Sequence, residues 1–434
     1  MTSSTPIFTH TWRLASPPDA VAIVAARGGE AGFYWENPEQ GFAIAAIGAA
    51  AEIIAEGPDR FERASAAAMA LMQGTHQSDG TLAPAPLIVG GFGFLDRRLD
   101  SRPWREFPAL RMFVPRAAVV RRGNQCSLTL AWRDGERTAA EETASRICAA
   151  SRESYEPKPV QILDAAADAQ ERLHWIARVE EVRGLISRGW LRKVVLARCR
   201  TVAGSAPIDP AAILVRARHA RPWCSSFWFA GGTSNFIGST PEVLVSLRDG
   251  WVRSDALAGS TPRGLTPEQD RELGLALIGS VKNLLEHRIV VAAISGALRS
   301  VAEPLTVGEL PAIRLLPEAQ HLYTPISGKL CHPMTVLELA SLLHPTPAVC
   351  GIPVDLAREL IERKEPDRGW YTGAVGWMDA AGGGEFAVAL RSALIEGDRM
   401  TLWAGAGIVE GSEAESEFDE TEAKMKALLP GGTQ

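Results

Sequence analysis

"LWAGAGIVEGSEAESEFDETEAKMKALL", residues 402–429, joins a run of small and apolar residues to a run crowded with acids. The first run predicts a strand with Gly405 and Gly407 on one face, where the missing side chains leave room for a ligand. Acidic residues gather at the start of the second run, where the positive end of a helix dipole favours them. We therefore expect a strand followed by a helix.

The helix expected over 415–429 carries acids where they are costly. At about 100° per residue, its apolar stripe comprises Phe418, Thr421, Met425, Leu428 and Leu429. The residues opposite, expected in solvent, are Glu415, Asp419, Glu422 and Lys426. On the shoulder of the stripe lie Glu417, Glu420 and Lys424. An ionised carboxylate there is unfavourable unless a cation meets it.

The composition is typical of a large globular protein. The chain has 434 residues, of which 46% are hydrophobic and 22% charged, so it can bury a large core and is long enough for two or three domains. A net charge of −6 argues against nucleic acid or an anionic membrane as the main partner. The N-terminal stretch has no signal-peptide pattern, and no run reaches the roughly 20 apolar residues of a membrane span. We expect a cytoplasmic protein that binds a small molecule.

The six cysteines and eight histidines show no spacing typical of a metal site or a disulfide framework. There is no CxxC, CxxH or HExxH pattern. We expect reduced, structural thiols.

Strands and helices follow one another in irregular order, which favours an α+β fold over regular βαβ winding. The polar stretch 151–170 marks either a domain boundary or a surface crossing within one domain. We therefore distinguish an N-terminal part, 1–160, from a part that carries the chemistry, 161–430, and expect the two to be intertwined in one domain. Expected elements are strand-like runs at 41–57, 87–95, 110–123 and 126–135, a helix at 170–188, strands at 193–200, 225–230, 235–238 and 243–248, and a long helix across 267–299.

A lysine begins the strand-like run "KVVLARCR" (193–200). By period-two alternation Lys193 shares a face with Val195, Ala197 and Cys199. Its side chain either snorkels to water, which spacing alone favours, or is held dry. A dry lysine can act as a general base.

Two further stretches combine turn residues with possible ligand contacts. In "FIGSTPEVLVSLRDGW" (236–251), Glu242 opens a strand, a position that is also common at protein surfaces. "ALAGSTPRG" (256–264) is predicted to be a turn-rich loop whose small residues let a ligand approach the backbone. Alternatively, Gly259 is needed only for a bend in the backbone.

The stretch "SVKNLLEHRIVVAAISGAL" (280–298) places Glu286 inside the apolar stripe of a helix. A glutamate in that position requires a partner. The partner is either Lys282, one turn away, in a structural ion pair, or a metal ion.

The stretch "EFAVALRSALI" (385–395) is predicted to be a strand with Arg391 on a face of alanines. Large apolar residues occupy the other face, so one side is packed and the other leaves room. An arginine among small residues suits either bidentate capture of a carboxylate or a core ion pair with one of the glutamates.

Taken together, these segments and their order resemble the chorismate-utilising enzyme family. The resemblance covers about residues 170–429, and in the first third of the chain only "GGFGF" (90–94) matches. Each motif alone is modest, but their combination in the family's order is highly specific. The motifs are "RKVVLAR", "GSTPEVLV", "ALAGSTPRG", "KNLLEHRIVV", "QHLYTPISG", "LHPTPAVCGIP", "DRGWYTGAVGW", "EFAVALRSAL" and "LWAGAGIVEGSEAESEFDETEAK".

The resemblance implies a fold and a metal site. The family's fold is a single large α+β domain with two curved antiparallel β-sheets packed together and helices outside. Its members bind chorismate, a dianionic ring acid, through Mg²⁺ at the ring carboxylate. By resemblance the metal ligands are Glu286 and Glu420, while Glu417 supports the metal's waters. A hard divalent cation would offset the desolvation of these acids.

The resemblance also implies the substrate contacts. Lys424 would reach a substrate carboxylate, and Arg391 with Tyr371 would hold the enolpyruvyl carboxylate. The other residues implied to line the cleft are Gly259, Ser260, His321 and Gly405. One position departs from the family pattern, because relatives generally have an acid where this chain has Asn283. Losing that charge would weaken Mg²⁺ binding or rearrange the groups around its ligands.

Three positions within the resemblance favour isochorismate synthase over other branches of the family. Lys193 stands where ammonia-adding members carry Gln, which indicates water as the nucleophile. Ala258 stands where aminodeoxychorismate synthases typically have a lysine that forms a covalent adduct. Ala348 stands where salicylate synthases usually have Thr, which favours stopping at isochorismate.

The implied reaction is the Mg²⁺-dependent isomerisation of chorismate to isochorismate. Lys193 would take a proton from the water that attacks C2, while Glu242 would protonate the departing C4 hydroxyl across the ring. The product would supply salicylate, siderophore or menaquinone synthesis through a separate isochorismate-consuming enzyme. We expect a monomer or a weak dimer.

Two alternatives remain open at this point. A bifunctional salicylate synthase would go on to eliminate pyruvate. A chorismate-binding module without turnover is the other alternative, for which Asn283 is the only hint. The joint presence of Lys193, Glu242, Glu286 and Glu420 argues against the latter.

Overall fold

The protein has an α+β fold built on antiparallel β-sheet, as predicted. The computed structural model describes residues 6–78, 86–98, 103–151, 155–158, 160–163, 169–317, 319–426 and 428–429. Within these ranges, the strand pairs are antiparallel except for β1 (Ile7–Arg13) with β4 (Thr75–Gln77). Of the polar stretch 151–170, residues 152–154, 159 and 164–168 lie outside the described residues.

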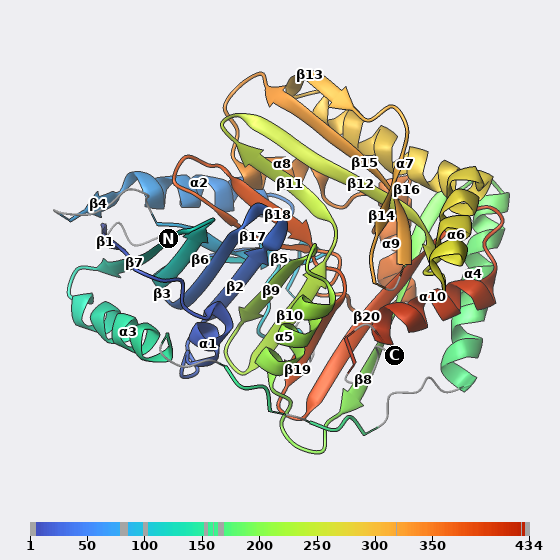
Figure 1. Cartoon of the computed structure of the whole chain (residues 1–434). Helices are drawn as coiled ribbons and strands as arrows, with labels where there is room; N and C mark the ends of the chain where they lie inside the picture. The colour runs from blue at the N-terminus through green and yellow to red at the C-terminus, as the bar shows by residue number, and fades with distance from the viewer. Residues whose placement is uncertain are drawn as a thin grey trace.

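The β-sheet divides into two branches, which meet at a pair of long strands (Figure 1). β3 (Phe42–Ala55) pairs with β6 (Leu110–Arg122) along their whole length, with an irregularity between Ala49 and Ala51. Each branch extends from this pair. The two curved sheets are therefore joined in one hydrogen-bonded network.

The first branch contains strands from both ends of the chain. In spatial order it runs β4, β1, β7 (Gln125–Arg133), β6, β3, β2 (Gly32–Asn37), β9 (Ser225–Ala230), β10 (Ser234–Thr240), β19 (Ser392–Glu396), β20 (Arg399–Ile408), β8 (Lys193–Ala203) and β16 (Gly351–Ile352).

The second branch has the same mixed origin. It runs β6, β5 (Ile88–Phe92), β17 (Ala374–Met378), β18 (Gly384–Val388), β11 (Val243–Arg248), β12 (Trp251–Pro262) and β15 (Ala319–Leu330), with β13 (Ala302–Val307) and β14 (Ala312–Leu315) paired to β15. The strands expected at 193–200, 225–230, 235–238 and 243–248 are all present.

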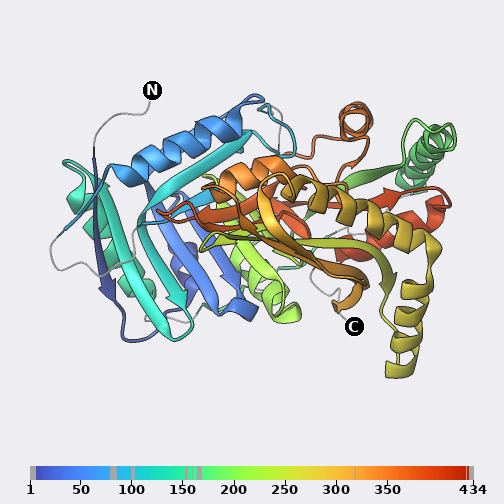
Figure 2. The same cartoon turned by 90° about the horizontal axis from the view of Figure 1, so that it is seen from above.

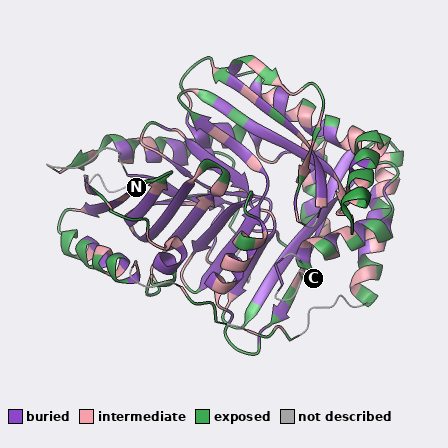
Figure 3. Ribbon diagram, viewed as in Figure 1, coloured by how far each residue is buried: buried purple, intermediate pink, exposed green. Residues whose placement is uncertain are grey.

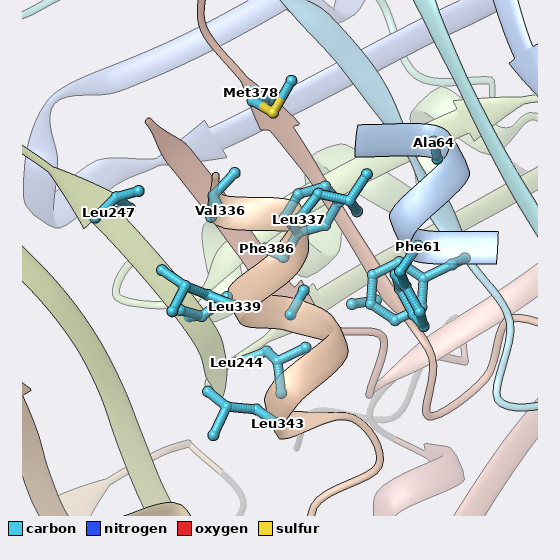
Figure 4. Packing of buried hydrophobic residues seen from close by; sticks show 14 of the residues in the cluster. Phe61, Ala64, Leu244, Leu247, Val336, Leu337, Leu339, Leu343, Met378 and Phe386 are labelled. Atoms are coloured by element: carbon cyan, nitrogen blue, oxygen red, sulfur yellow. The ribbon is translucent and has the colours of Figure 1, made fainter. Parts of the chain in front are cut away.

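Helices cover the outer faces (Figures 1 and 2). The first branch is covered by α1 (Ala20–Ala25), α3 (Arg137–Ala150) and α5 (Pro210–Ala220). The second branch is covered by α2 (Arg60–Gln73), α7 (Val281–Leu298) and α8 (Val336–Leu343). The apolar side chains of α8 pack against those of β11 and β18 (Figure 4). The end of the first branch, β20 and β8, packs against α4 (Ala169–Ser187), α9 (Val354–Lys364) and α10 (Ala414–Lys426). No helix among the described residues has both the length and the apolar character that crossing a membrane requires.

Large aromatic side chains fill the core between the two branches, where the strands are buried (Figure 3). Trp104 packs against Phe107 and Phe236 edge to face, with ring centroids 5.5 and 5.3 Å apart. Such pairs contribute about 0.5–1.5 kcal/mol each beyond their buried area. Trp403 lies 4.8 Å from Trp104 and places this core directly beside β20.

The long helix expected across 267–299 is two helices, so that prediction is wrong. α6 (Pro267–Gly279) ends before Ser280, whose backbone is extended (φ −76°, ψ 114°). The Ser280 hydroxyl accepts a hydrogen bond from Asn283 N at 3.3 Å and caps α7. Consequently α6 and α7 run in different directions (Figure 2).

Two other predictions of local structure are also wrong. The stretch 256–264 is not a free loop, because most of it belongs to β12, whose pairing with β15 shifts between Leu257 and Ser260. Gly259 adopts a left-handed φ of +80° at this irregularity. The stretch 385–395 is two strands, β18 and β19, separated by a turn in which Arg391 has a φ of +46°.

Candidate active site

A cavity of about 750 Å³ lies among α7, α10, β12, β20 and the turns after β10, α9 and β18. This volume is in the range of small-molecule sites. Its lining includes every residue proposed above to act in substrate or metal binding, together with one of the two acid-base candidates. Those residues are Glu242, Gly259, Ser260, Glu286, His321, Ala348, Tyr371, Arg391, Gly405, Glu417, Glu420 and Lys424.

The other acid-base candidate, Lys193, does not line this cavity itself but contacts Glu286, which does. Lys193 is the first residue of β8 and its side chain is fully buried, so the alternative in which it snorkels to water is wrong. Its Nζ lies 3.0 Å from Glu286 Oε1. The partner of Glu286 in this structure is therefore Lys193, not Lys282.

Glycine at position 407 makes room for this pair. Gly407 lies opposite Val195 in the pairing of β20 with β8. A Cβ added at Gly407 would lie 2.5 Å from Glu286 Oε1 and 3.2 Å from Lys193 Cε. The small-residue face expected for this strand thus accommodates protein side chains as well as a ligand.

The two acids on the inner face of α10 each contact a lysine. Glu417 Oε1 accepts a hydrogen bond from Lys282 Nζ at 2.7 Å. Burial and then the charge of Glu420 raise the pKa of Glu417, although Lys282 opposes them. Glu420 Oε1 accepts hydrogen bonds from Lys424 Nζ at 2.5 Å and Ser260 Oγ at 3.2 Å. Burial alone would raise the pKa of Glu420, but Lys424, together with His321 and Ser260, outweighs burial and the pKa is lowered.

The outer face of α10 is fastened to β8 and thereby keeps the inner face toward the cavity. Arg198 Nε donates to Thr421 Oγ1 at 2.6 Å, and the guanidinium groups of Arg198 and Arg200 both pair with Glu422. The predicted apolar stripe of α10 is buried as expected, but Glu422 is not free in solvent. Its side chain is only 15% exposed, because two arginines from a neighbouring strand reach it.

The acids of α7 and α10 converge on one region of the cavity. Burial lowers the pKa of Lys282, but the charges of Glu417, Glu286 and Glu420 outweigh burial and raise it above the ordinary value. In the part of the chain that the structure describes, no three His, Cys, Asp or Glu side chains are placed to hold a metal ion together. Each of these carboxylates instead faces a lysine. Their carboxylate oxygens are donors of the kind that a hard divalent cation prefers.

A buried carboxyl group occupies another wall of the cavity. Glu242 is 3% exposed and is anchored by Val388 N, which donates to the Glu242 carbonyl at 3.0 Å. Burial, with a smaller effect of Asp255, raises the pKa of Glu242 to about 8, although Lys193 and Lys424 lower it. Glu242 is therefore protonated near neutral pH and can donate a proton.

Arg391 and Tyr371 line the cavity from two turns. Tyr371 is 3% exposed and its ring stacks on Trp403 with centroids 6.3 Å apart. Burial raises the pKa of Tyr371, so its hydroxyl remains a neutral donor. A Cβ at Gly405 would lie 3.2 Å from that hydroxyl, which shows why a glycine faces it. A guanidinium and a phenol in one wall can bind a carboxylate.

Two residues that contribute to the site, Thr372 and His287, were not anticipated from the sequence, and Lys282 was considered as a partner of Glu286 rather than of Glu417. Thr372 lines the cavity with a φ of +62°, a strained conformation for a β-branched residue. His287 lies between Ala258 O (3.1 Å from Nδ1) and Thr324 Oγ1 (2.8 Å from Nε2), so it fixes α7 to the sheet. Lys282 holds Glu417. The adjacency of Thr372 to Tyr371 and of His287 to Glu286 was the available signal.

Asn283, the position that departs from the family pattern, also lines the cavity. Its side-chain amide donates to Ser280 Oγ at 2.9 Å. Here the residue contributes to capping α7.

Two known proteins are similar to this chain over most of its length. The chain is 35% identical over 404 residues to the salicylate biosynthesis isochorismate synthase of Pseudomonas aeruginosa, covering 91% of this chain and 83% of the relative. It is 33% identical to the isochorismate synthase MenF of Bacillus subtilis, covering 92% of this chain and 87% of the relative.

Solved structures show the same similarity. The menaquinone-specific isochorismate synthase MenF of Escherichia coli superposes with a TM-score of 0.81 at 28% identity, covering 99% of this chain and 96% of that chain. Anthranilate synthase component I of Streptococcus pneumoniae shares the fold with a TM-score of 0.70 at 22% identity, covering 89% and 92%. A family model described as "Chorismate binding enzyme" matches residues 3–431. The chain therefore belongs to the chorismate binding enzyme family.

Proposed function

We propose that this protein is an isochorismate synthase, an isomerase that converts chorismate to isochorismate. The observation that carries the proposal is a cavity lined by Glu242, a carboxylic acid that is protonated near neutral pH, and by Glu286, whose carboxylate contacts the fully buried Lys193. The two relatives and the solved structure named above as isochorismate synthases support it.

The proposed reaction needs a proton acceptor and a proton donor. In its neutral amine form, Lys193 accepts a proton from the water that attacks C2 of chorismate, and the Glu286 carboxylate beside Nζ then pairs with the ammonium that forms. Glu242 donates its proton to the C4 hydroxyl, which departs as water. Both side chains are buried in the folded protein.

The remaining cavity residues would orient the substrate. Arg391 and Tyr371 would hold the enolpyruvyl carboxylate, and Lys424 would approach the other carboxylate from α10. Gly259, Ser260, His321, Ala348 and Gly405 complete the walls. Holding a rigid ring between the acid and the base is the main contribution of these residues to the rate.

We also propose Mg²⁺ as the cofactor, held by Glu286 and Glu420 with Glu417 nearby. Bound there, the ion would supply positive charge at the ring carboxylate. The cluster of oxygen donors from α7 and α10 supports this assignment.

Removal of divalent metal is expected to abolish activity. The purified protein should lose isochorismate formation in excess EDTA and regain it when Mg²⁺ is added in excess of the chelator. The rate of isochorismate formation, followed by chromatography, measures the effect. Activity that persists in EDTA would contradict the metal assignment.

Replacing Gly407 with alanine is expected to weaken Mg²⁺ binding at least tenfold, because the new Cβ would displace the Glu286 carboxylate. Calorimetric titration with Mg²⁺ measures the change. Gly296→Ala is a matched control, since Gly296 lies on the helix that carries Glu286 and has open space around it. Equal Mg²⁺ affinity in Gly407→Ala and wild type would exclude Glu286 as a ligand.

The product distinguishes the proposal from its closest alternative. Pure protein with chorismate and Mg²⁺ should accumulate isochorismate. Salicylate and pyruvate without accumulated isochorismate would instead show a salicylate synthase. Tight chorismate binding with no product would show a binding module. The proposed product requires a separate downstream enzyme, as in salicylate or menaquinone synthesis, for which two of the relatives above are named.

A further inference from the structure

We propose that Arg368 and Glu365 form a buried ion pair that positions three walls of the active-site cavity, and that both residues set kcat and KM without touching substrate. The inference rests on the proposed function. The pair lies in the segment between α9 and β17. Arg368 Nε is 2.7 Å from Glu365 Oε2, and the two side chains are 2% and 1% exposed.

The pair completes the hydrogen bonding of β8 where its neighbouring strand ends. β16 pairs only with the first two residues of β8. Beyond it, Val195 O accepts a hydrogen bond from Arg368 Nη2 at 2.7 Å, and Ala197 N donates to Glu365 Oε1 at 2.7 Å. Two charged side chains thus replace the missing strand next to Lys193.

The same guanidinium also reaches the two other walls. Arg368 Nη1 donates to Val349 O at 2.8 Å and lies 3.4 Å from Thr372 Oγ1. The Arg368 carbonyl accepts a hydrogen bond from Tyr371 N at 2.9 Å. Val195, Val349, Tyr371 and Thr372 all line the cavity. One residue therefore joins the strand of the proposed base, the loop before β16 and the turn that carries Tyr371.

The chemistry of arginine suits this role. Its planar group offers five donors in fixed directions, which here serve two carbonyls, a hydroxyl and a carboxylate. A buried pair of this kind contributes little net stability compared with an apolar pair, but it fixes geometry. A lysine at this position keeps the positive charge but cannot donate hydrogen bonds in the same fixed directions. The variant Arg368→Lys therefore tests whether the directed hydrogen bonds, rather than the positive charge alone, position the cavity walls.

The test compares Arg368→Lys and Glu365→Gln with the wild-type enzyme. We expect kcat/KM to fall at least about tenfold in Arg368→Lys, through both a lower kcat and a higher KM, because small displacements of reacting groups are costly. Glu365→Gln should show a smaller loss in the same direction. Rates are expressed per folded molecule, with the folded fraction from near-ultraviolet circular dichroism. A merely structural role would change thermal stability and leave both constants unchanged.

Arg178→Met is the matched control. Arg178 also donates to the backbone of β8, at Ala197 O (3.3 Å), and to the end of α9 at Lys364 O (3.3 Å), but neither of these residues lines the cavity. It should retain wild-type kcat and KM. If Arg368→Lys does not fold, the double variant Glu365→Gln/Arg368→Met, which leaves no unpaired buried charge, replaces it in the same comparison.

Unchanged kcat and KM in the Arg368 and Glu365 variants, or an equal loss in Arg178→Met, would overturn the inference. Wild-type product formation tests the proposed function by itself. Calorimetric Kd values for chorismate test the positioning role even without turnover. Weaker binding in Arg368→Lys than in Arg178→Met supports that role, and equal binding refutes it.

Discussion

Replacement of Lys193 by methionine is expected to lower kcat for isochorismate formation by about 10²–10⁴-fold, the usual contribution of a general base. The proposed water attack at C2 has no proton acceptor once the amine is gone. Methionine fills a similar volume in a fully buried position, so the fold should persist. Single-turnover kinetics with saturating chorismate and Mg²⁺ measure the loss.

A control and a rescue make this result specific. Lys364→Met removes a partly exposed lysine that pairs with Glu181 on the surface and should leave kcat unchanged. Lys193→Ala should be inactive but partly restored by a small primary amine that can enter the cavity. A Lys193→Met enzyme with near wild-type kcat would show that another group activates the water.

The second large effect is expected at Glu242. Glu242→Gln keeps the shape of the side chain but has no acidic proton to give to the C4 hydroxyl, so kcat should again fall roughly 10²–10⁴-fold. In the wild-type enzyme the protonated form is the active one. Activity should therefore decline as pH rises through about 8, the pKa of this group. A pH–rate profile measures both effects.

The wild-type protein should become less stable than Glu242→Gln as the pH rises. The folded-state pKa of Glu242 is above its unfolded value of 4.5. Its contribution to the free energy of unfolding is therefore fully present below about pH 4.5 and is lost as pH rises toward about 8. Glu242→Gln escapes this loss and should be the more stable protein at pH 7, by on the order of a few kcal/mol. Denaturant unfolding from pH 5 to 9 measures the difference.

Glu385→Gln is the appropriate control for both measurements. Burial raises the pKa of Glu385 as well, but its carboxylate accepts hydrogen bonds from Asn37 and Gln40 and does not line the cavity. This variant should keep wild-type kcat. Should Glu242→Gln also keep it, or should the wild-type rate stay level through pH 8, the proton-donor assignment would be wrong.

Periodicity alone predicted much of the local structure correctly. The apolar stripe of α10, the strand that begins at Lys193 and the strands around 225–248 are all present, because burial of one face imposes its period on the sequence. It failed where single residues interrupt an element. Neither the cap at Ser280 nor the left-handed turn at Arg391 changes the hydrophobic pattern around it.

The sequence by itself determined which chemical groups are present and on which face of their helix or strand they lie. Motif order added the family and therefore the fold. Only the tertiary structure decided which groups meet: Glu286 contacts Lys193 rather than Lys282, and Arg368 reaches the backbone of Val349 and Val195. The physical reason is that periodicity describes one element at a time. Ion pairs between segments more than 90 residues apart, as between Lys193 and Glu286, depend on how separate elements pack.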